Sequence, residues 1–192
     1  MSVVLQGYHG TFTDCVDEIL MNRFTIAKRP DHWLGYGAYF YQDDERHALC
    51  WANIKRKRHV AYMGKTVAVI KAIIEVERRH CLNMTLQADF EKLANYAKDF
   101  LVSKRGELFV ENQLENRCYL YDCFATENEI KVIVASFSKE WADPAATLMF
   151  GIIFGEIQIC VKDQLTITSK ECTYRETPIT VSLRKKHWRG KP

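Results

Sequence analysis

Apolar and polar residues alternate at every second position in several short stretches of this chain, which is the period of a β-strand with one buried face. Residues 3–11, VVLQGYHGT, predict an opening strand that ends in a glycine-flanked turn. Residues 66–77, TVAVIKAIIEVE, are almost continuously apolar and rich in β-branched residues, and they predict a buried strand. The remaining predicted strands lie at 37–41, 129–137, 156–167 and 178–183.

Three other stretches have apolar residues spaced three or four positions apart, the period of an amphipathic helix. Residues 13–24 predict a helix capped by a threonine or an aspartate. Residues 43–58 begin with acids and end with bases, an order that complements the helix dipole. Residues 86–104 have the clearest helical period, and residues 105–126 have no clear pattern. Strands near both ends of the chain, with helices inserted early and midway, predict an α+β domain.

The stretch LGYGAYFYQDD, residues 34–44, has two glycines two residues apart, followed by three consecutive aromatic residues. The alternation of a strand places Tyr39 and Tyr41 on one face and Phe40 on the other. These rings are either ordinary core or a flat surface on which a flat ligand stacks. Trp51, in the predicted helix that follows, is positioned to add a second aromatic surface.

A second strand carries an acid and an amide side by side. In the segment FGEIQICVKD, alternation places Glu156 and Gln158 on one face, while Ile157 and Ile159 occupy the other. An exposed sheet edge explains this pair as well as a functional site does. A third candidate is GYHGT, residues 7–11, where a histidine imidazole and a glycine backbone are available to the same ligand.

Length and composition set limits on these alternatives. The 192 residues and 22.4 kDa suit one domain, and 47% of the residues are hydrophobic. The seven cysteines are odd in number and scattered without a CxxC pair, which disfavours a disulfide framework or a zinc site and suits a reducing compartment. No apolar run of membrane-spanning length and no secretion signal is evident, so a cytoplasmic protein is expected.

The formal net charge is only +3, but the bases are concentrated in two places. They gather at residues 55–59, KRKRH, and in the C-terminal tail at 184–192. Such runs are usually solvated surface. The alternative is a contact surface for a phosphate-rich partner such as RNA or DNA, formed by residues 55–59 and 184–191.

In order and spacing, the segments YHGT, GYGAYF with the following ALCWA, and EIQICVKDQLTI resemble the ADP-ribosyltransferase superfamily. They are most similar to the histidine–tyrosine–glutamate branch, which includes diphtheria toxin and the poly(ADP-ribose) polymerases. The resemblance spans about 160 of the 192 positions, without a recognisable match in the middle. It implies a split β-sandwich, two antiparallel sheets around an NAD cleft, within one catalytic domain over residues 1–183 followed by the basic tail.

The resemblance also implies roles for individual residues. His9 would hold a ribose hydroxyl of NAD+, Gly10 would bind the nicotinamide carboxamide through its backbone, and Tyr39 would stack on the nicotinamide. Glu156 would be the catalytic acid. Further NAD-binding positions implied by the resemblance are Thr11, Trp51 and Gln158. NAD+ would serve as co-substrate, and no metal is expected.

The position of the acid is ambiguous. Aligned by the run QICVKD, Gln158 rather than Glu156 falls where the family has its glutamate. Only Glu156 can supply negative charge beside the developing oxocarbenium ion, so Glu156 is the preferred acid, and Gln158 would orient ribose or the acceptor.

Mono-ADP-ribosylation of a macromolecule, with nucleic acid slightly favoured over protein, is therefore the expected activity. A toxin or phage-defence effector with a neutralising partner protein would suit a lone domain of this kind. An inactive NAD- or nucleotide-binding module and an NAD glycohydrolase are the alternatives.

Overall fold

A computed structural model describes residues 1–26, 28–29, 32–103, 112–138 and 155–177 of the chain. Within these ranges the protein is an α+β structure with seven strands and four α-helices. The strands are β1 Ser2–Phe12, β2 Ala38–Gln42, β3 Val67–Glu77, β4 Cys81–Asn83, β5 Val132–Ser138, β6 Gly155–Val161 and β7 Ile167–Arg175. The helices are α1 Val16–Met21, α2 Glu45–Arg58, α3 Gln87–Ser103 and α4 Gln113–Glu127, with short 3-10 turns between elements.

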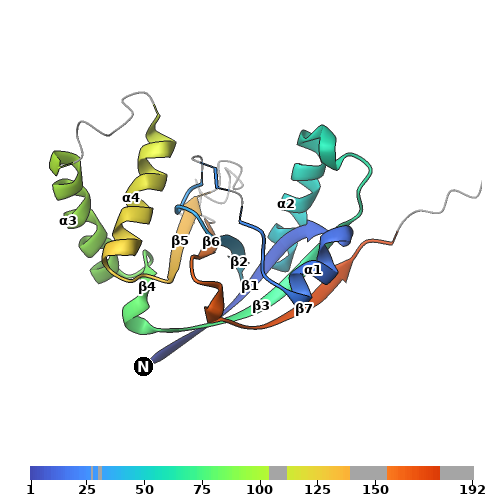
Figure 1. The fold of residues 1–192 in the computed structure, drawn as a ribbon, viewed down its shortest axis with the longest axis horizontal. Helices are drawn as coiled ribbons and strands as arrows, with labels where there is room; N and C mark the ends of the chain where they lie inside the picture. Colours follow the sequence, from blue (N-terminus) through green and yellow to red (C-terminus); the bar gives the residue numbers. More distant parts are fainter. Residues whose placement is uncertain (27, 30–31, 104–111, 139–154, 178–192) are drawn as a thin grey trace, which may run out of the picture.

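All seven strands belong to one hydrogen-bonded sheet in the order β4-β5-β6-β2-β1-β3-β7. Neighbouring strands run antiparallel except for β4 and β5, which are parallel. The predicted α+β class is confirmed. Figure 1 shows α3 and α4 beside β4 and β5 at one end of the sheet, and α1 and α2 beside β1, β3 and β7 at the other.

The pairing of the sheet is unequal along β1. Strand β1 pairs with β3 over its whole length, from Ser2↔Glu77 to Phe12↔Val67. Its pairing with β2 covers Gly7↔Gln42 and Tyr8↔Tyr41. The two strands therefore diverge next to His9, and only a short backbone pairing joins the two parts of the sheet at this point.

The two faces of the sheet carry different helices. On one face, Val16 and Ile19 of α1 pack with Phe40 of β2 and Ile70 of β3 in the largest core cluster. On the other face, α4 packs Phe124 against Ile133 of β5. The same second face receives α2, whose buried Ala52 packs with Phe12 and Val67. Strands β2 and β6 lie between the parts of this face that α2 and α4 cover.

Most predicted elements are confirmed at their centres. The sequence did not predict α4 within residues 105–126, the short strand β4, or the separation of residues 156–167 into β6 and the start of β7. The predicted strand at 178–183 and the basic tail at 184–192 lie outside the described residues.

Candidate functional site

The two glycines of the GYG segment are required by close packing. Gly35 has φ of 81°, and a Cβ there would lie 2.3 Å from Oδ1 of Asp122 on α4. A Cβ on Gly37 would lie 2.5 Å from Sγ of Cys160 on β6. Both distances are too short for any side chain, so the glycines allow the loop to pass between α4 and β6.

An ion pair between Lys162 of the β6 end and Asp122 of α4 holds this loop in place. The Nζ of Lys162 lies 2.5 Å from Oδ1 of Asp122 and donates to the carbonyl oxygen of Tyr36 at 3.2 Å. Asp122 in turn accepts the backbone N–H of Tyr36 at 3.0 Å. Because both side chains are largely shielded from solvent and share a third partner, the pair determines the loop geometry more strongly than an exposed ion pair would.

Tyr39 is tied to the same loop through its hydroxyl. The hydroxyl donates to the carbonyl oxygen of Gly35 at 2.7 Å and accepts the N–H of Leu34 at 2.8 Å. Burial raises the pKa of Tyr39 far above its ordinary value, so the phenol stays protonated. Its ring meets the ring of His32 edge-on with centroids 5.4 Å apart. The structure therefore gives Tyr39 an anchoring role in the loop.

His9 lies on the other face of the sheet. Its ring contacts Phe24 at 5.0 Å and Phe40 at 5.8 Å between centroids, both edge-on. Its Nδ1 lies 2.8 Å from the carbonyl oxygen of Tyr39, so Nδ1 carries the proton and donates it. Burial lowers the pKa of His9, and the hydrogen bond to Tyr39 opposes that effect in part. The imidazole is thus a neutral bridge between β1 and β2.

Gly10 presents its backbone where the two strands diverge. The N–H of Asp43 donates to the carbonyl of Gln6 at 3.1 Å. Because hydrogen-bonding direction alternates along an antiparallel strand, even-numbered residues of β1 direct their N–H and C=O groups toward β2. Gly10 follows the last β1–β2 pair, Tyr8↔Tyr41, by two residues, so its backbone faces this divergence. A Cβ at Gly10 would lie 2.0 Å from the carbonyl oxygen of Ala48, so α2 packs directly on it.

The acid and amide project together from β6, as the alternation predicted. We call the surface formed by Tyr41, Ala135, Glu156 and Gln158 the central face. Gln158 pairs with Tyr41 on one side and Ala135 on the other, and its Nε2 donates to Oε1 of Glu156 at 2.5 Å. Burial and, next, the charge of Glu156 raise the pKa of Tyr41. A carboxylate, an amide and a protonated phenol therefore share one surface.

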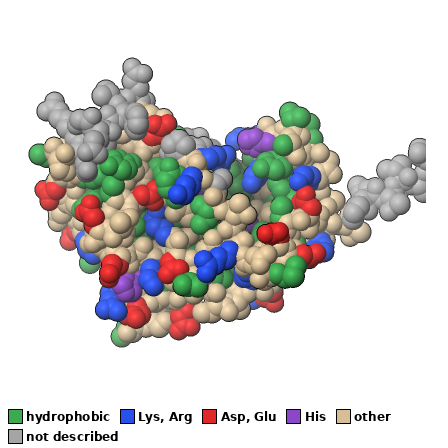
Figure 2. Space-filling view, in the orientation of Figure 1, with side chains coloured by type: hydrophobic (Ala, Val, Ile, Leu, Met, Phe, Trp, Pro, Cys, Tyr) green, Lys and Arg blue, Asp and Glu red, His purple; other side chains and the backbone are tan. Residues whose placement is uncertain are grey.

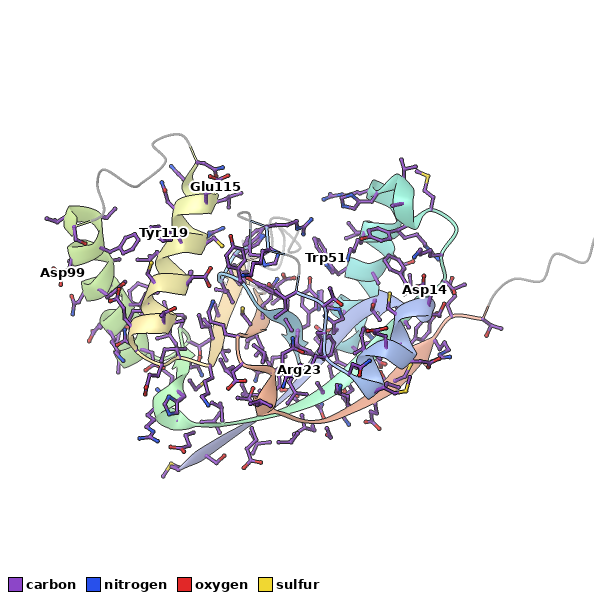
Figure 3. All side chains as sticks on the ribbon, in the orientation of Figure 1. Asp14, Arg23, Trp51, Asp99, Glu115 and Tyr119 are labelled. Carbon is purple, nitrogen blue, oxygen red and sulfur yellow. The ribbon has the colours of Figure 1, made fainter. Side chains whose placement is uncertain are left out.

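Aromatic residues flank the central face on both sides. On the α2 side, the ring of His47 lies 5.8 Å from that of Tyr41, and Trp51 follows one helical turn later with 46% of its surface exposed. Figure 3 shows Trp51 projecting from α2 toward the space between α2 and α4, and the surface dips between these helices in Figure 2. On the other side, Phe137 meets Trp33 edge-on at 5.2 Å, and Arg117 of α4 lies over Trp33.

The structure brings together some of the predicted site residues and separates others. Tyr39, Glu156 and Gln158 share one face of the sheet, which α2 with Trp51 also covers. Tyr39 pairs with Cys160, four residues from Glu156, so the two are separated by roughly 13 Å along the strand direction. His9 points to the opposite face, and Thr11 is buried there. His47 was not predicted as a site residue, although it lies three residues after Asp44 and four before Trp51, a spacing that places all three on one side of a helix.

The basic segment at residues 55–59 is partly engaged within the protein. Lys55 Nζ lies 5.1 Å from the ring centroid of Tyr62, and Arg56 forms an ion pair with Glu176 at 2.7 Å. Lys57, Arg58 and His59 are exposed. A phosphate-rich partner would therefore meet three bases here rather than five, and the second basic segment, 184–191, lies outside the described residues.

A cavity at the β4 end of the sheet is separate from the central face. It is lined by Met1, Arg78, Asp89 and Lys92 among others, and by no residue of the central face. No cluster of three metal-ligating side chains occurs in the described part of the chain. Among the helices of that part, none combines the length and apolarity needed to cross a bilayer.

Comparisons with known proteins do not identify a family. No protein-family model matches the chain, and no solved structure matches it significantly. The chain is similar to an uncharacterised protein of Methanocaldococcus jannaschii, with 27% identity over 186 residues that cover 85% of each chain. The similarity along most of both chains indicates a shared domain, but carries no functional information.

Proposed function

We propose that this protein is a mono-ADP-ribosyltransferase that moves ADP-ribose from NAD+ to a macromolecule and releases nicotinamide. The observation that supports the proposal is the adjacency of three segments far apart in sequence. The segments that contain His9, Tyr39 and Glu156 form β1, β2 and β6, which are consecutive neighbours at the centre of the sheet. His9 and Tyr39 are also joined directly by a hydrogen bond.

The proposed reaction needs little beyond binding, orientation and charge. The bond between the ribose anomeric carbon and the nicotinamide nitrogen breaks, and its electron pair leaves with nicotinamide, which becomes neutral. The anomeric carbon gains positive character and then bonds to the acceptor, which loses a proton. A carboxylate beside this carbon stabilises the transition state electrostatically.

Glu156 is assigned to that electrostatic role. It is the carboxylate of the central face, and its Oε1 accepts the amide N–H of Gln158. This hydrogen bond from Gln158 holds the carboxyl group of Glu156 on the central face. Gln158 lies two residues nearer than Glu156 to the position opposite Tyr39, and it is assigned to hold a ribose hydroxyl or the acceptor.

The nicotinamide end of NAD+ is assigned to the divergence between β1 and β2. Gly10 would contact the carboxamide there through its backbone, and Tyr39 and Trp51 would supply ring contacts. His9 would act from within the divergence, since its side chain is not on the central face. The described strands form one sheet and not the two sheets that the family resemblance implies, so the proposed NAD cleft would lie where the β1–β2 pairing is short.

Incubation with NAD+ labelled in the adenylate, in separate reactions with protein, RNA and DNA, tests the proposal. Label on one pool together with release of nicotinamide is the expected result, and nucleic acid is the preferred pool. A toxin or phage-defence role with a neutralising partner belongs to the same proposal. Intact NAD+ in all three reactions, with no transfer and no nicotinamide release, would overturn it.

One observation favours a second candidate, an NAD-binding module without catalysis. Gln158, not Glu156, lies directly opposite Tyr41 in the middle of the central face. An amide there can bind ribose but cannot stabilise a cation by charge. Saturable binding of NAD+ by calorimetry with no nicotinamide release over many hours would identify this candidate, whereas free ADP-ribose without labelled acceptor would identify a glycohydrolase.

A further inference from the structure

The start of helix α2 contains an aspartate–histidine pair beside the central face. Asp44 caps the helix, and its Oδ1 accepts the backbone N–H of His47 at 2.9 Å. Its second oxygen, Oδ2, is hydrogen bonded to Nδ1 of His47. One carboxylate therefore fixes both the backbone and the ring of the same histidine.

This pairing determines which ring nitrogen is available. An aspartate only accepts hydrogen bonds when ionised, so Nδ1 of His47 carries the proton, and Nε2 of the neutral ring is left as a base. A histidine oriented by a carboxylate through Nδ1, with Nε2 directed to a reacting group, is the arrangement used for general-base catalysis.

His47 is also placed where a base would be needed. Its ring lies 5.8 Å from the ring of Tyr41 at an interplanar angle of 31°, so it covers the α2 side of the central face. Trp51 lies one helical turn further on. The charged and titratable groups around this contact are Asp44 and Cys50 from α2 and its cap, and Glu156 from β6, all of which raise the pKa of Tyr41. His47 remains half-buried, with access to solvent.

From this geometry we infer that His47 Nε2 accepts the proton of the acceptor nucleophile, and that Asp44 positions His47 for this step. The inference rests on the proposed transferase function and adds a second group to it. Glu156 would stabilise the ribose cation, while His47 would activate the acceptor.

The step balances without a further reactant. As the acceptor oxygen or nitrogen bonds to the anomeric carbon, its proton moves to Nε2 of His47, and nicotinamide leaves with the electron pair of the broken bond. The imidazolium formed is stabilised by Asp44, and it returns the proton to solvent. Departure of nicotinamide alone does not require this base, so hydrolysis and transfer should respond differently to its loss.

The test compares two variants that retain the helix cap. His47→Asn keeps an amide donor for Asp44 but removes Nε2. Asp44→Asn keeps a good capping residue but turns an amide N–H toward Nδ1, which would move the histidine proton to Nε2. Transfer is measured from pH 5 to 9 with the acceptor pool that the wild type labels, and release of nicotinamide in the absence of acceptor is measured in parallel. His80→Asn is the matched control, because His80 contacts the carbonyl of Glu129 at a different end of the sheet.

We expect both variants to lose about 10²-fold or more in transfer, while nicotinamide release without acceptor changes only a few-fold. Because only an unprotonated Nε2 can accept a proton, transfer by the wild type should rise with pH between 5 and 9, and this rise should be absent in His47→Asn. His47→Gln provides a second variant if His47→Asn unfolds, and ¹⁵N NMR of the wild type should show His47 with its proton on Nδ1.

Failure of this inference differs from failure of the proposed function. A wild type that leaves NAD+ intact overturns the transferase itself. An active wild type in which both His47 variants keep the transfer rate and the pH-dependent rise, or in which NMR finds the proton on Nε2, overturns only the role of His47.

Discussion

Nδ1 of His9 donates a hydrogen bond to the carbonyl oxygen of Tyr39, 2.8 Å away, and this bond joins β1 and β2 beyond the end of their own backbone pairing. The imidazole replaces the next pair of strand hydrogen bonds. The ring of His9 also contacts two apolar rings, those of Phe24 and Phe40. Among the described residues, no acid acts on His9, and a charged ring in this position would lose water without gaining a counter-ion. The contact between β1 and β2 therefore depends on a neutral histidine.

The stability of the protein should therefore depend on pH through His9. Burial holds the pKa of His9 below the 6.5 of a free histidine. Between these two pKa values the unfolded chain binds a proton that the folded protein does not, so stability falls as the pH drops below 6.5 and levels off below the folded pKa. The slope contributed by one such group is at most about 1.4 kcal/mol per pH unit. Urea unfolding at pH 8, 7, 6 and 5 measures it.

His9→Asn should be less stable at pH 8 but should lose this part of the slope. His80→Asn serves as the control and should keep the wild-type slope, because His80 bonds to the carbonyl of Glu129 on the rim of the fold. Parallel pH curves for the wild type and His9→Asn would show that His9 is not held neutral in the folded protein.

The close packing of the GYG loop predicts a stability cost at Gly37. A Cβ at this position would lie 2.5 Å from Sγ of Cys160 and 2.8 Å from the carbonyl oxygen of Val161, so β6 or the loop has to shift. We expect Gly37→Ala to lower the free energy of unfolding by about 1–3 kcal/mol. Gly64→Asn is the control, since Gly64 has nothing within 4 Å of its Cβ position and asparagine tolerates its positive φ. Equal stability of the two variants in chemical denaturation would refute the packing argument.

The hydroxyl of Tyr39 provides a separate test of the same loop. Tyr39→Phe keeps the ring but leaves the carbonyl of Gly35 and the N–H of Leu34 without this partner, and both residues are buried. The expected loss is about 1–3 kcal/mol in the free energy of unfolding, because buried polar groups are left unsatisfied. Tyr174→Phe, on the exposed strand β7, should change stability by less than about 0.5 kcal/mol. If Tyr39 only stacked on a ligand, Tyr39→Phe would be as stable as the wild type.

The strands could be predicted from the sequence, and so could the placement of Glu156 and Gln158 on one face, because alternation is a local property of the chain. The face of the sheet that His9 occupies could not be predicted. It depends on which strands become neighbours and in which register, and β1, β2 and β6 come from segments up to about 150 residues apart. The same holds for the hydroxyl of Tyr39, whose two partners are set by the loop conformation rather than by residue type.

Helix α4 shows why a helical period can be absent from a real helix. Its Phe124 packs against the sheet, and Tyr119 meets Phe100 of α3. Asp122 faces neither solvent nor core but bonds to Lys162 and Tyr36 in the GYG loop. Since apolar and polar residues both point inward on different sides, the sequence has no single apolar stripe for a pattern to detect.

The separate roles of Glu156 and Gln158 can be distinguished with one substitution at each position. Glu156→Gln removes the charge of the carboxylate but keeps its size, so NAD+ should still bind while nicotinamide release falls by about 10²–10³-fold. Gln158→Ala should weaken binding of NAD+ or of the acceptor more than it slows release, because Gln158 offers hydrogen bonds without charge. Both variants are compared by calorimetry with NAD+ and by single-turnover release of nicotinamide. An active Glu156→Gln together with an inactive Gln158→Ala would move the critical position to residue 158 and would exclude a carboxylate as the source of the stabilisation.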